Sequence, residues 1–202
     1  MLKYKIHIFI LYFIIITAFA YIGASWLPQS KAKNKNTITA SDNGNFFWDI
    51  YPELVIPNTG KTVEEQLNIV DINNNKISIK KLSSKQPLLV FRYSQYDCHL
   101  CINQVLNKLQ TFFAGSEHHV CMIIDGMNPR DFRIKYKDLG LKIQPYFIEE
   151  QNLGLSLENK NLPFLFVLSP DPLRVDKIFI PFKEYPHQTD AYLKNVKSIL
   201  ND

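Results

Sequence analysis

Hydrophobic positions along this chain follow two patterns, short continuous runs and longer stretches with helical spacing. The short apolar runs, which are of buried-strand type, occupy residues 87–93, 120–125, 146–148, 162–168 and 175–180. After the first run, apolar residues recur every three or four positions between Ile102 and Phe113, which predicts a helix. Asn128 and Pro129 then supply an N-cap and a first-turn proline for a second helix, which we expect to end near Gly140.

Weaker patterns flank these elements. Residues 71–79 have the pattern of a strand, an Asn-rich turn and a second strand, which predicts an entry hairpin. Near the other end of the chain, Thr189 is expected to cap a last helix whose apolar positions share one face. After the entry hairpin, the expected order is therefore β-α-β-α-β, then a hairpin, then a helix. Alternating strands and helices predict an α/β fold with a central mixed sheet and helices on both faces.

The N-terminus follows a third pattern. Lys3 and Lys5 precede residues 8–27, which include no charged residue. The length of this run lies between those of secretory signals and membrane spans, so two interpretations stay open. We favour an uncleaved signal anchor, an N-terminal hydrophobic helix that crosses the membrane, over a cleaved signal peptide. Both interpretations place the remainder of the chain outside the cytoplasm, on the periplasmic side.

Composition divides the chain into three parts. Residues 1–27 form the leader, and residues 28–45 are rich in Lys, Asn, Ser and Thr without apolar periodicity, as in a flexible polar linker. The composition turns aromatic at residue 46, so we expect the folded domain to span residues 46–202. The net charge of +4 falls to +2 without the two leader lysines, and this balance gives no reason to predict a nucleic-acid surface.

Cysteine usage favours redox chemistry over a disulfide-stabilised scaffold, for which three cysteines are too few. Cys98 and Cys101 form a close pair where the strand at 87–93 gives way to a helix. There the unpaired N–H groups of the helix start favour a thiolate, which is the reactive form of cysteine. Cys121 lies in the apolar run 120–125, and we expect it to be a buried thiol that packs like a small hydrophobic residue.

Other uses of a cysteine pair do not fit these surroundings. Covalent haem attachment requires a histidine directly after the second cysteine, where Ile102 stands. A zinc site needs two further ligands, but His118 and His119 are adjacent and the sequence has no second cysteine pair. A peroxiredoxin would carry Thr or Ser where Gln95 stands. We therefore predict no metal and no cofactor.

From about residue 60 to its end, the chain resembles the extracytoplasmic thioredoxin-like proteins of the TlpA/ResA type. The resemblance is carried by the entry hairpin, by the strand that leads into Cys98 and Cys101, and by the long helix after them. Pro163 at the start of a later strand, the closing hairpin and helix, and the leader complete it. The resemblance implies a thioredoxin-like fold and thiol–disulfide oxidoreductase activity.

The same resemblance implies roles for individual residues. Cys98 would be the nucleophile, and Cys101 would be the resolving thiol that breaks the mixed disulfide. Pro163 would match the family's cis-proline beside the dithiol, and the backbone of Leu162 would pair with the extended substrate chain. The implied partners are a cysteine-containing client protein and a membrane electron carrier that resets the dithiol.

The chain departs from the family pattern around the cysteines. Asp97 precedes the first cysteine, where Trp is common in thioredoxins, and its charge would disfavour the thiolate of Cys98. A cationic His99 would favour that thiolate. Arg92 stands where thioredoxins place a buried acid that relays protons, and an arginine cannot act as a base. The carboxylates that could serve as relay instead are Asp97, Asp125 and Glu149.

A second class of function stays open. In it the chain is a thioredoxin-fold interaction module, and the cysteine pair is a local structural staple. Reversible exchange of the dithiol with a small-thiol buffer distinguishes the enzyme from this module. Because Asp97 and a cationic His99 act on the thiolate in opposite directions, client cysteines could be either reduced or oxidised.

Overall fold

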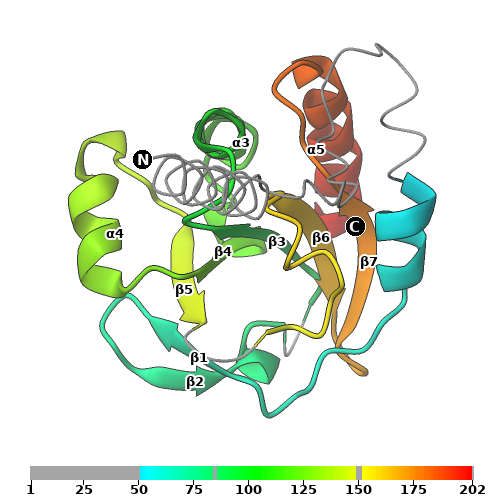
Figure 1. Cartoon of the computed structure of the whole chain (residues 1–202), viewed down its shortest axis with the longest axis horizontal. Helices are drawn as coiled ribbons and strands as arrows, with labels where there is room; N and C mark the ends of the chain where they lie inside the picture. The colour runs from blue at the N-terminus through cyan, green and yellow to red at the C-terminus, as the bar shows by residue number, and fades with distance from the viewer. Residues whose placement is uncertain (1–50, 84–85, 149–151, 202) are drawn as a thin grey trace, which may run out of the picture. The chain divides into compact units, whose positions relative to one another are not determined.

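A seven-stranded mixed sheet runs through the described part of the chain, with strand order β2-β1-β5-β4-β3-β6-β7 (Figure 1). The computed structural model describes residues 51–83, 86–148 and 152–201, so the expected leader (1–27) and linker (28–45) lie outside it. The strands are β1 (Asn68–Asp71), β2 (Lys76–Ser78), β3 (Leu88–Ser94), β4 (Val120–Asp125), β5 (Gln144–Ile148), β6 (Phe164–Ser169) and β7 (Arg174–Phe179). The central pairs β3–β4 and β4–β5 are parallel, and the other pairs are antiparallel.

The helices of the described residues follow the order expected from the sequence. The α-helices are α3 (His99–Phe112), α4 (Pro129–Lys135) and α5 (Pro186–Asn201). The short 3-10 or π turns are η1 (Tyr51–Val55), η2 (Ile56–Asn58), η3 (Ile79–Lys81), η4 (Glu117–His119) and η5 (Lys137–Leu139). The β1–β2 hairpin precedes β3-α3-β4-α4-β5, and the β6–β7 hairpin and α5 close the chain, so the expected element order is confirmed.

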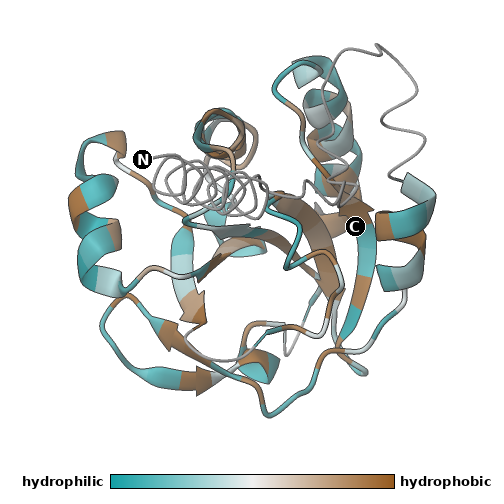
Figure 2. Ribbon diagram, in the orientation of Figure 1, coloured by the Kyte–Doolittle hydropathy of each residue, from teal (hydrophilic) through white to brown (hydrophobic). Residues whose placement is uncertain are grey.

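The central strands are buried on both faces, which explains their continuous apolar runs. All seven residues of β3 are buried. In the parallel ladder with β4, Ser94 lies opposite Asp125, so the carboxyl ends of these two strands meet at one edge of the sheet. Figure 2 shows β3 and β6 hydrophobic over most of their length, whereas α4 and α5 alternate between hydrophobic and hydrophilic residues. The helix that carries the cysteine pair starts at this edge.

The two faces of the sheet are covered differently. On one face, the odd-numbered residues of β3 pack with buried residues of α3, α4 and α5 in a single hydrophobic cluster. On the other face, Leu88 and Val90 pack in a second cluster that includes Leu153, Leu155 and Leu157. The expectation of helices on both faces is therefore corrected, because the described α-helices share one face. The three leucines of an irregular segment, together with η1 and η3, supply the apolar cover of the other face.

Two helix ends differ from the expectation. The helix α5 starts at Pro186, and Thr189 is buried inside it rather than capping it. A proline fits the first turn of a helix because its missing N–H needs no partner there. The helix α4 begins as expected, with Asn128 Oδ1 accepting a hydrogen bond from the N–H of Asp131 at 2.9 Å. Its α-helical part stops earlier than expected, and η5 then leads to Gly140, whose φ is +55°.

The structure leaves the predicted membrane segment outside its range. Among the described residues, no helix combines the length and the apolar character that crossing a membrane requires. The expected N-terminal hydrophobic helix falls within residues 1–27, outside the described ranges. All the described helices and strands belong to one compact unit.

Candidate functional site

Cys98 and Cys101 lie where β3 gives way to α3. After β3 the chain bends sharply, and the N–H of Asp97 donates to the carbonyl of Ser94 at 3.1 Å. Cys98 is the N-cap residue of α3, and its Sγ accepts a hydrogen bond from the N–H of Cys101 at 3.4 Å. The expected placement of the pair at a strand–helix junction is confirmed, and the first sulfur receives an N–H of the helix start.

The two sulfur atoms are close together but differ in exposure. The Sγ atoms of Cys98 and Cys101 are 2.6 Å apart, and both cysteines are free. Cys98 is half-buried, whereas Cys101 is 8% exposed. Burial, and after it the adjacent Cys98 sulfur, raises the pKa of Cys101 to about 12, although the backbone of Lys183 acts in the opposite direction. Cys101 is therefore a thiol at neutral pH, and Cys98 is the sulfur that a second molecule can reach.

A buried carboxyl group precedes the pair. Asp97 Oδ2 accepts a hydrogen bond from the N–H of Ser94 at 2.8 Å, while Oδ1 has no hydrogen-bond partner among the described residues. Burial raises the pKa of Asp97, and the Ser94 N–H and the Arg92 guanidinium oppose this rise. A buried acid with a raised pKa and one free oxygen can take up a proton, so Asp97 remains a candidate for the relay group.

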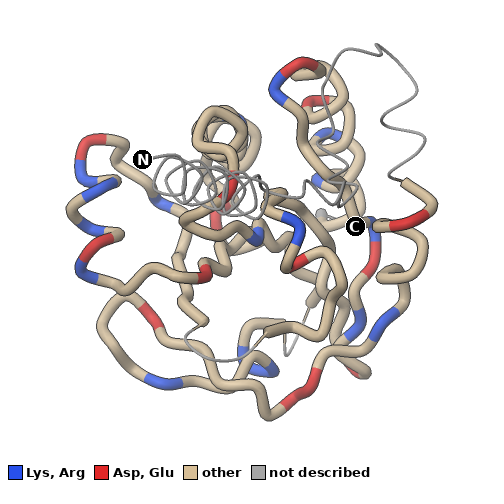
Figure 3. Tube along the Cα trace, in the orientation of Figure 1, with Lys and Arg blue, Asp and Glu red and all other residues tan. Residues whose placement is uncertain are grey.

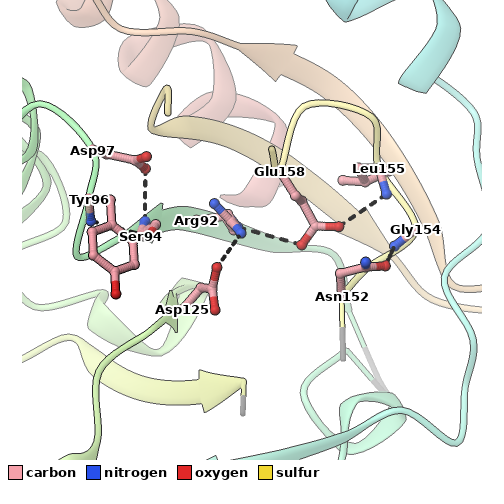
Figure 4. A network of polar contacts seen from close by, with 9 residues as sticks. All are labelled: Arg92, Ser94, Tyr96, Asp97, Asp125, Asn152, Gly154, Leu155 and Glu158. Carbon is pink, nitrogen blue, oxygen red and sulfur yellow. Dashed lines mark hydrogen bonds and ion pairs between the residues drawn. The ribbon is translucent and has the colours of Figure 1, made fainter. Parts of the chain in front are cut away.

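Arg92 is buried on β3, and Figure 4 shows its guanidinium between the carboxylates of Asp125 and Glu158. Its Nη2 lies 3.2 Å from Asp125 Oδ2, and its Nε lies 3.5 Å from Glu158 Oε1. The guanidinium carbon also lies 5.7 Å from the centroid of the Phe164 ring. The Glu158 side chain is 2% exposed and that of Asp125 is 43% exposed. Arg92 thus forms a buried ion pair at the position where the family pattern has an acid.

Glu158 is a buried carboxylate that the sequence did not reveal. It belongs to a polar stretch at 156–161 that has no periodic pattern, so nothing in the sequence marks it as a buried carboxylate. Its Oε2 accepts a hydrogen bond from the N–H of Leu155 at 3.1 Å. Burial raises the pKa of Glu158, while the backbone of Leu153 and the charge of Arg92 oppose the rise. Glu158 ties the segment before Pro163 to β3. Glu149, another relay candidate, lies outside the described residues.

Exposed residues lie close to Cys98 in the sequence. Tyr96, two residues before it, is 75% exposed, and Leu100, two residues after it, is 64% exposed. His99 is also exposed, and its Nε2 lies 2.8 Å from Nζ of Lys135 at the end of α4. Nothing in the sequence marks Lys135 as a neighbour of His99, because only the fold brings residues so distant in sequence together.

Leu162 and Pro163 directly precede β6. In the antiparallel ladder of β6 with β3, Phe164 pairs with Arg92. Continuing this register places Pro163 at the level of Tyr93 and Leu162 one step nearer to the end of β3. Both residues are therefore placed toward the end of β3 that leads to the cysteine pair.

The conformation of Pro163 differs from the expectation. The Leu162–Pro163 bond is trans, and the cis X-Pro bond among the described residues is Asp171–Pro172. The expectation of a cis-proline at position 163 is therefore wrong. A trans proline is compatible with the position just before a strand, because no hydrogen bond of the β-ladder requires an N–H group there.

The third cysteine is separate from this site. Cys121 lies near the start of β4, is 3% exposed and packs in the second hydrophobic cluster. Burial raises its pKa, so it is an unreactive thiol, and the expectation of a buried core cysteine is confirmed. Among residues 51–83, 86–148 and 152–201, no group of three or more His, Cys, Asp or Glu side chains is placed to hold a metal ion.

Solved structures with a similar fold are known, although no protein-family model and no curated protein sequence matches the chain. One is the solution structure of a candidate protein disulfide isomerase from Bacteroides thetaiotaomicron, with a TM-score of 0.55, 8% identity and coverage of 71% of this chain and 91% of that one. Another is the crystal structure of a cysteine-to-serine mutant of PrxQ from Xylella fastidiosa, with a TM-score of 0.50, 11% identity and coverage of 70% and 96%. At these identities the likeness shows the fold alone, which is thioredoxin-like.

Proposed function

We propose that this chain catalyses thiol–disulfide exchange on cysteine-containing client proteins, with Cys98 as the attacking and Cys101 as the resolving sulfur. The observation that carries the proposal is an unequal pair of thiols with Sγ atoms 2.6 Å apart, one at a helix N-cap and half-buried, the other buried. The Sγ of Cys98 accepts the N–H of Cys101 at 3.4 Å, so the attacking sulfur lies against the helix start. Burial keeps Cys101 protonated until the mixed disulfide forms. The resemblance to TlpA/ResA-type proteins supports the same assignment.

The exchange proceeds in two displacement steps. In the reducing direction, the Cys98 thiolate bonds to one sulfur of a client disulfide, whose S–S bond breaks, and the departing client thiolate takes a proton from water. Cys101 then gives its proton to a base, for which Asp97 is our candidate, and attacks the Cys98 sulfur. The mixed disulfide breaks, and the second client sulfur leaves as a thiolate that water protonates. The client gains two electrons and the pair becomes a disulfide; the oxidising direction is the reverse.

A polypeptide client fits the surroundings of Cys98 better than a small thiol does. Tyr96 and Leu100, two residues before and two residues after Cys98 in the sequence, are 75% and 64% exposed. Burying such groups against a partner is a main source of binding free energy. The backbone at Leu162, at the same edge of the sheet, is our candidate for extended pairing with the client chain.

The compartment and a second partner belong to the same proposal. The apolar run at residues 8–27 supports an anchor that holds the domain on the periplasmic side. A dithiol that has exchanged with a client must be reset before the next cycle. We propose a membrane electron carrier for this step, as the family resemblance implies.

A redox titration of the full chain in mild detergent tests the proposal. The protein is equilibrated in graded glutathione buffers, its thiols are trapped by alkylation, and the products are weighed. We expect a reversible two-electron transition between about −120 and −270 mV. The transition should vanish in Cys98→Ser and persist in Cys121→Ala, which separates the pair from the buried thiol. A pair that never forms a disulfide, or that stays oxidised below about −300 mV, would exclude the catalyst.

The Arg92–Glu158 ion pair favours a second candidate, a thioredoxin-fold interaction module with a structural cysteine pair. In this reading the buried acid has been replaced because proton relay is no longer needed, and the exposed Tyr96 and Leu100 serve binding alone. The same titration distinguishes the two, since a module needs no reversible exchange. Its expected behaviour is the locked or unformed disulfide described above.

A further inference from the structure

The helix α4 reaches the cysteine site through its last residue. Nζ of Lys135 lies 2.8 Å from Nε2 of His99, which directly follows Cys98 in the first turn of α3. The same Nζ lies 5.4 Å from the centroid of the Tyr136 ring, within cation–π range. Figure 3 shows Lys and Arg recurring along α4, and Lys135 brings one of these charges to the start of α3.

The contact between the two nitrogen atoms determines which side chain carries the charge. A lysine ammonium has three N–H donors and no acceptor, so the Nε2 atom of His99 must accept. An imidazole accepts at Nε2 only when it is neutral and carries its proton on Nδ1. A protonated imidazole would direct a second N–H and a second positive charge at Lys135. With Lys135 as the charged donor, this contact requires His99 to accept at Nε2.

No carboxylate among the described residues forms an ion pair with Lys135 or His99. Four acidic groups on the neighbouring elements are engaged elsewhere: Asp131 with Asn128, Asp97 with Ser94, Asp125 with Arg92, and Glu184 with Lys183. Asp138 on η5 forms no ion pair with Lys135. Partial burial lowers the pKa of Lys135, as expected for a cation without a counter-charge. Lys135 is thus a cation that forms no ion pair among the described residues, and it lies beside the residue that directly follows Cys98.

We propose that Lys135, rather than His99, is the cation that tunes Cys98. Lys135 holds the imidazole of His99 neutral by donating to Nε2, and its ammonium charge stabilises the Cys98 thiolate across the start of α3. Lys135 is thus a positioning and tuning residue that acts through its charge and through His99, without contacting the client. The inference builds on the proposed function, because it names the group that sets the reactivity of the attacking sulfur.

Alkylation kinetics test the charge effect. The rate of reaction of Cys98 with iodoacetamide at neutral pH is measured for the full chain in mild detergent. We expect Lys135→Met to slow the reaction by about two- to fivefold, the effect of one nearby exposed charge, and Lys135→Arg to restore most of it. The difference should shrink in about 1 M salt, where charges are screened. Lys137→Met, which removes an equivalent charge from η5, is the matched control and should leave the rate unchanged.

The protonation of His99 supplies a second readout that a purely structural role would not move. Nitrogen chemical shifts of the imidazole should report a proton on Nδ1 and an accepting Nε2 in the unmodified chain. In Lys135→Met the form with a proton on Nε2 should increase, while the thermal unfolding midpoint stays within a few degrees. An unchanged tautomer together with an unchanged alkylation rate would overturn the proposal. A rate that falls in His99→Gln but not in Lys135→Met would make His99 the cation instead.

These measurements separate the inference from the function on which it builds. Neither alkylation nor the imidazole shifts require redox exchange. A locked disulfide in the glutathione titration, combined with a slower alkylation of the chemically reduced Lys135→Met variant, would refute the catalytic function and keep the tuning role. A reversible titration, combined with an alkylation rate that Lys135→Met leaves unchanged, would keep the catalytic function and refute the tuning role.

Discussion

Replacing Arg92 by methionine removes a cation from a place that water cannot reach. The side chains of Arg92 and Glu158 are each 2% exposed, with Nε 3.5 Å from Oε1. After the substitution the Glu158 carboxylate is a buried charge without a counter-ion, and breaking a buried pair in this way costs about 3–5 kcal/mol. The contact with Asp125 adds little, about 0–1 kcal/mol, because that carboxylate is 43% exposed and water can solvate it. We expect Arg92→Met to lower the free energy of unfolding by about 3 kcal/mol at neutral pH.

The pH dependence and a double variant show whether the buried charge is the cause. Burial already raises the pKa of Glu158, and loss of Arg92 removes a group that opposes this rise. A carboxyl with a raised folded-state pKa contributes stability that is lost as the pH rises. The loss of unfolding free energy caused by Arg92→Met should therefore become smaller as the pH falls from about 7 to about 5. Arg92→Met combined with Glu158→Leu removes both charges and should recover at least about 1 kcal/mol relative to Arg92→Met, even though the Leu155 N–H loses its acceptor.

Urea unfolding followed by circular dichroism measures these differences. The matched control is Arg174→Met, since Arg174 pairs with Asp176 at 2.9 Å but is 50% exposed. Its loss should cost less than about 1 kcal/mol. An Arg92→Met variant that loses no more stability than this control, or whose loss does not change with pH, would show that the buried charge is not the cause.

Three further predictions concern the cysteine site. Iodoacetamide at about pH 8 should modify Cys98 and spare Cys101 in peptide mapping, because a pKa of about 12 leaves only about one Cys101 thiol in ten thousand ionised; equal labelling would contradict the assignment. Asp97→Asn should gain stability relative to the unmodified chain as the pH rises above 3.8, because the raised folded-state pKa of Asp97 contributes stability only at low pH. Urea midpoints at acidic and neutral pH test this effect. The same substitution should slow the release of a mixed disulfide. Replacing Tyr96 and Leu100 by serine should slow exchange with a disulfide-bonded protein about tenfold and leave the glutathione equilibrium unchanged; an equal loss with glutathione would argue against client contacts.

Local patterns in the sequence were sufficient for most of the fold. The continuous apolar run of β3 reflects burial on both faces, and Asn128 with Pro129 marked the start of α4 correctly. The position of Cys98 and Cys101 at a helix start followed from the same patterns. These features depend on residues close together in the chain, which is why sequence reasoning finds them.

The features that the sequence did not reveal depend on contacts between distant segments. Glu158 and Lys135 are ordinary polar residues in the sequence, and only the folded chain places one beside Arg92 and the other beside His99. The sequence did not predict that irregular segments cover the second face of the sheet, because leucines without periodic spacing do not indicate a buried surface. The cis-proline came from the family resemblance alone, and position 163 departs from it.

The carboxyl groups around Arg92 explain how an arginine at this position can be compatible with thiol–disulfide exchange. Three carboxyl groups, from Asp97, Asp125 and Glu158, interact with one guanidinium. Asp125 is accessible to water, but Asp97 and Glu158 are buried. Burial raises the pKa of both carboxyl groups, and the charge of Arg92 only partly opposes this rise. Such a cluster readily holds a proton, and Asp97 is the member next to Cys98. The proton that Cys101 must release can therefore be stored without an acid at position 92, so an arginine there is compatible with exchange as long as the surrounding carboxyls outnumber it.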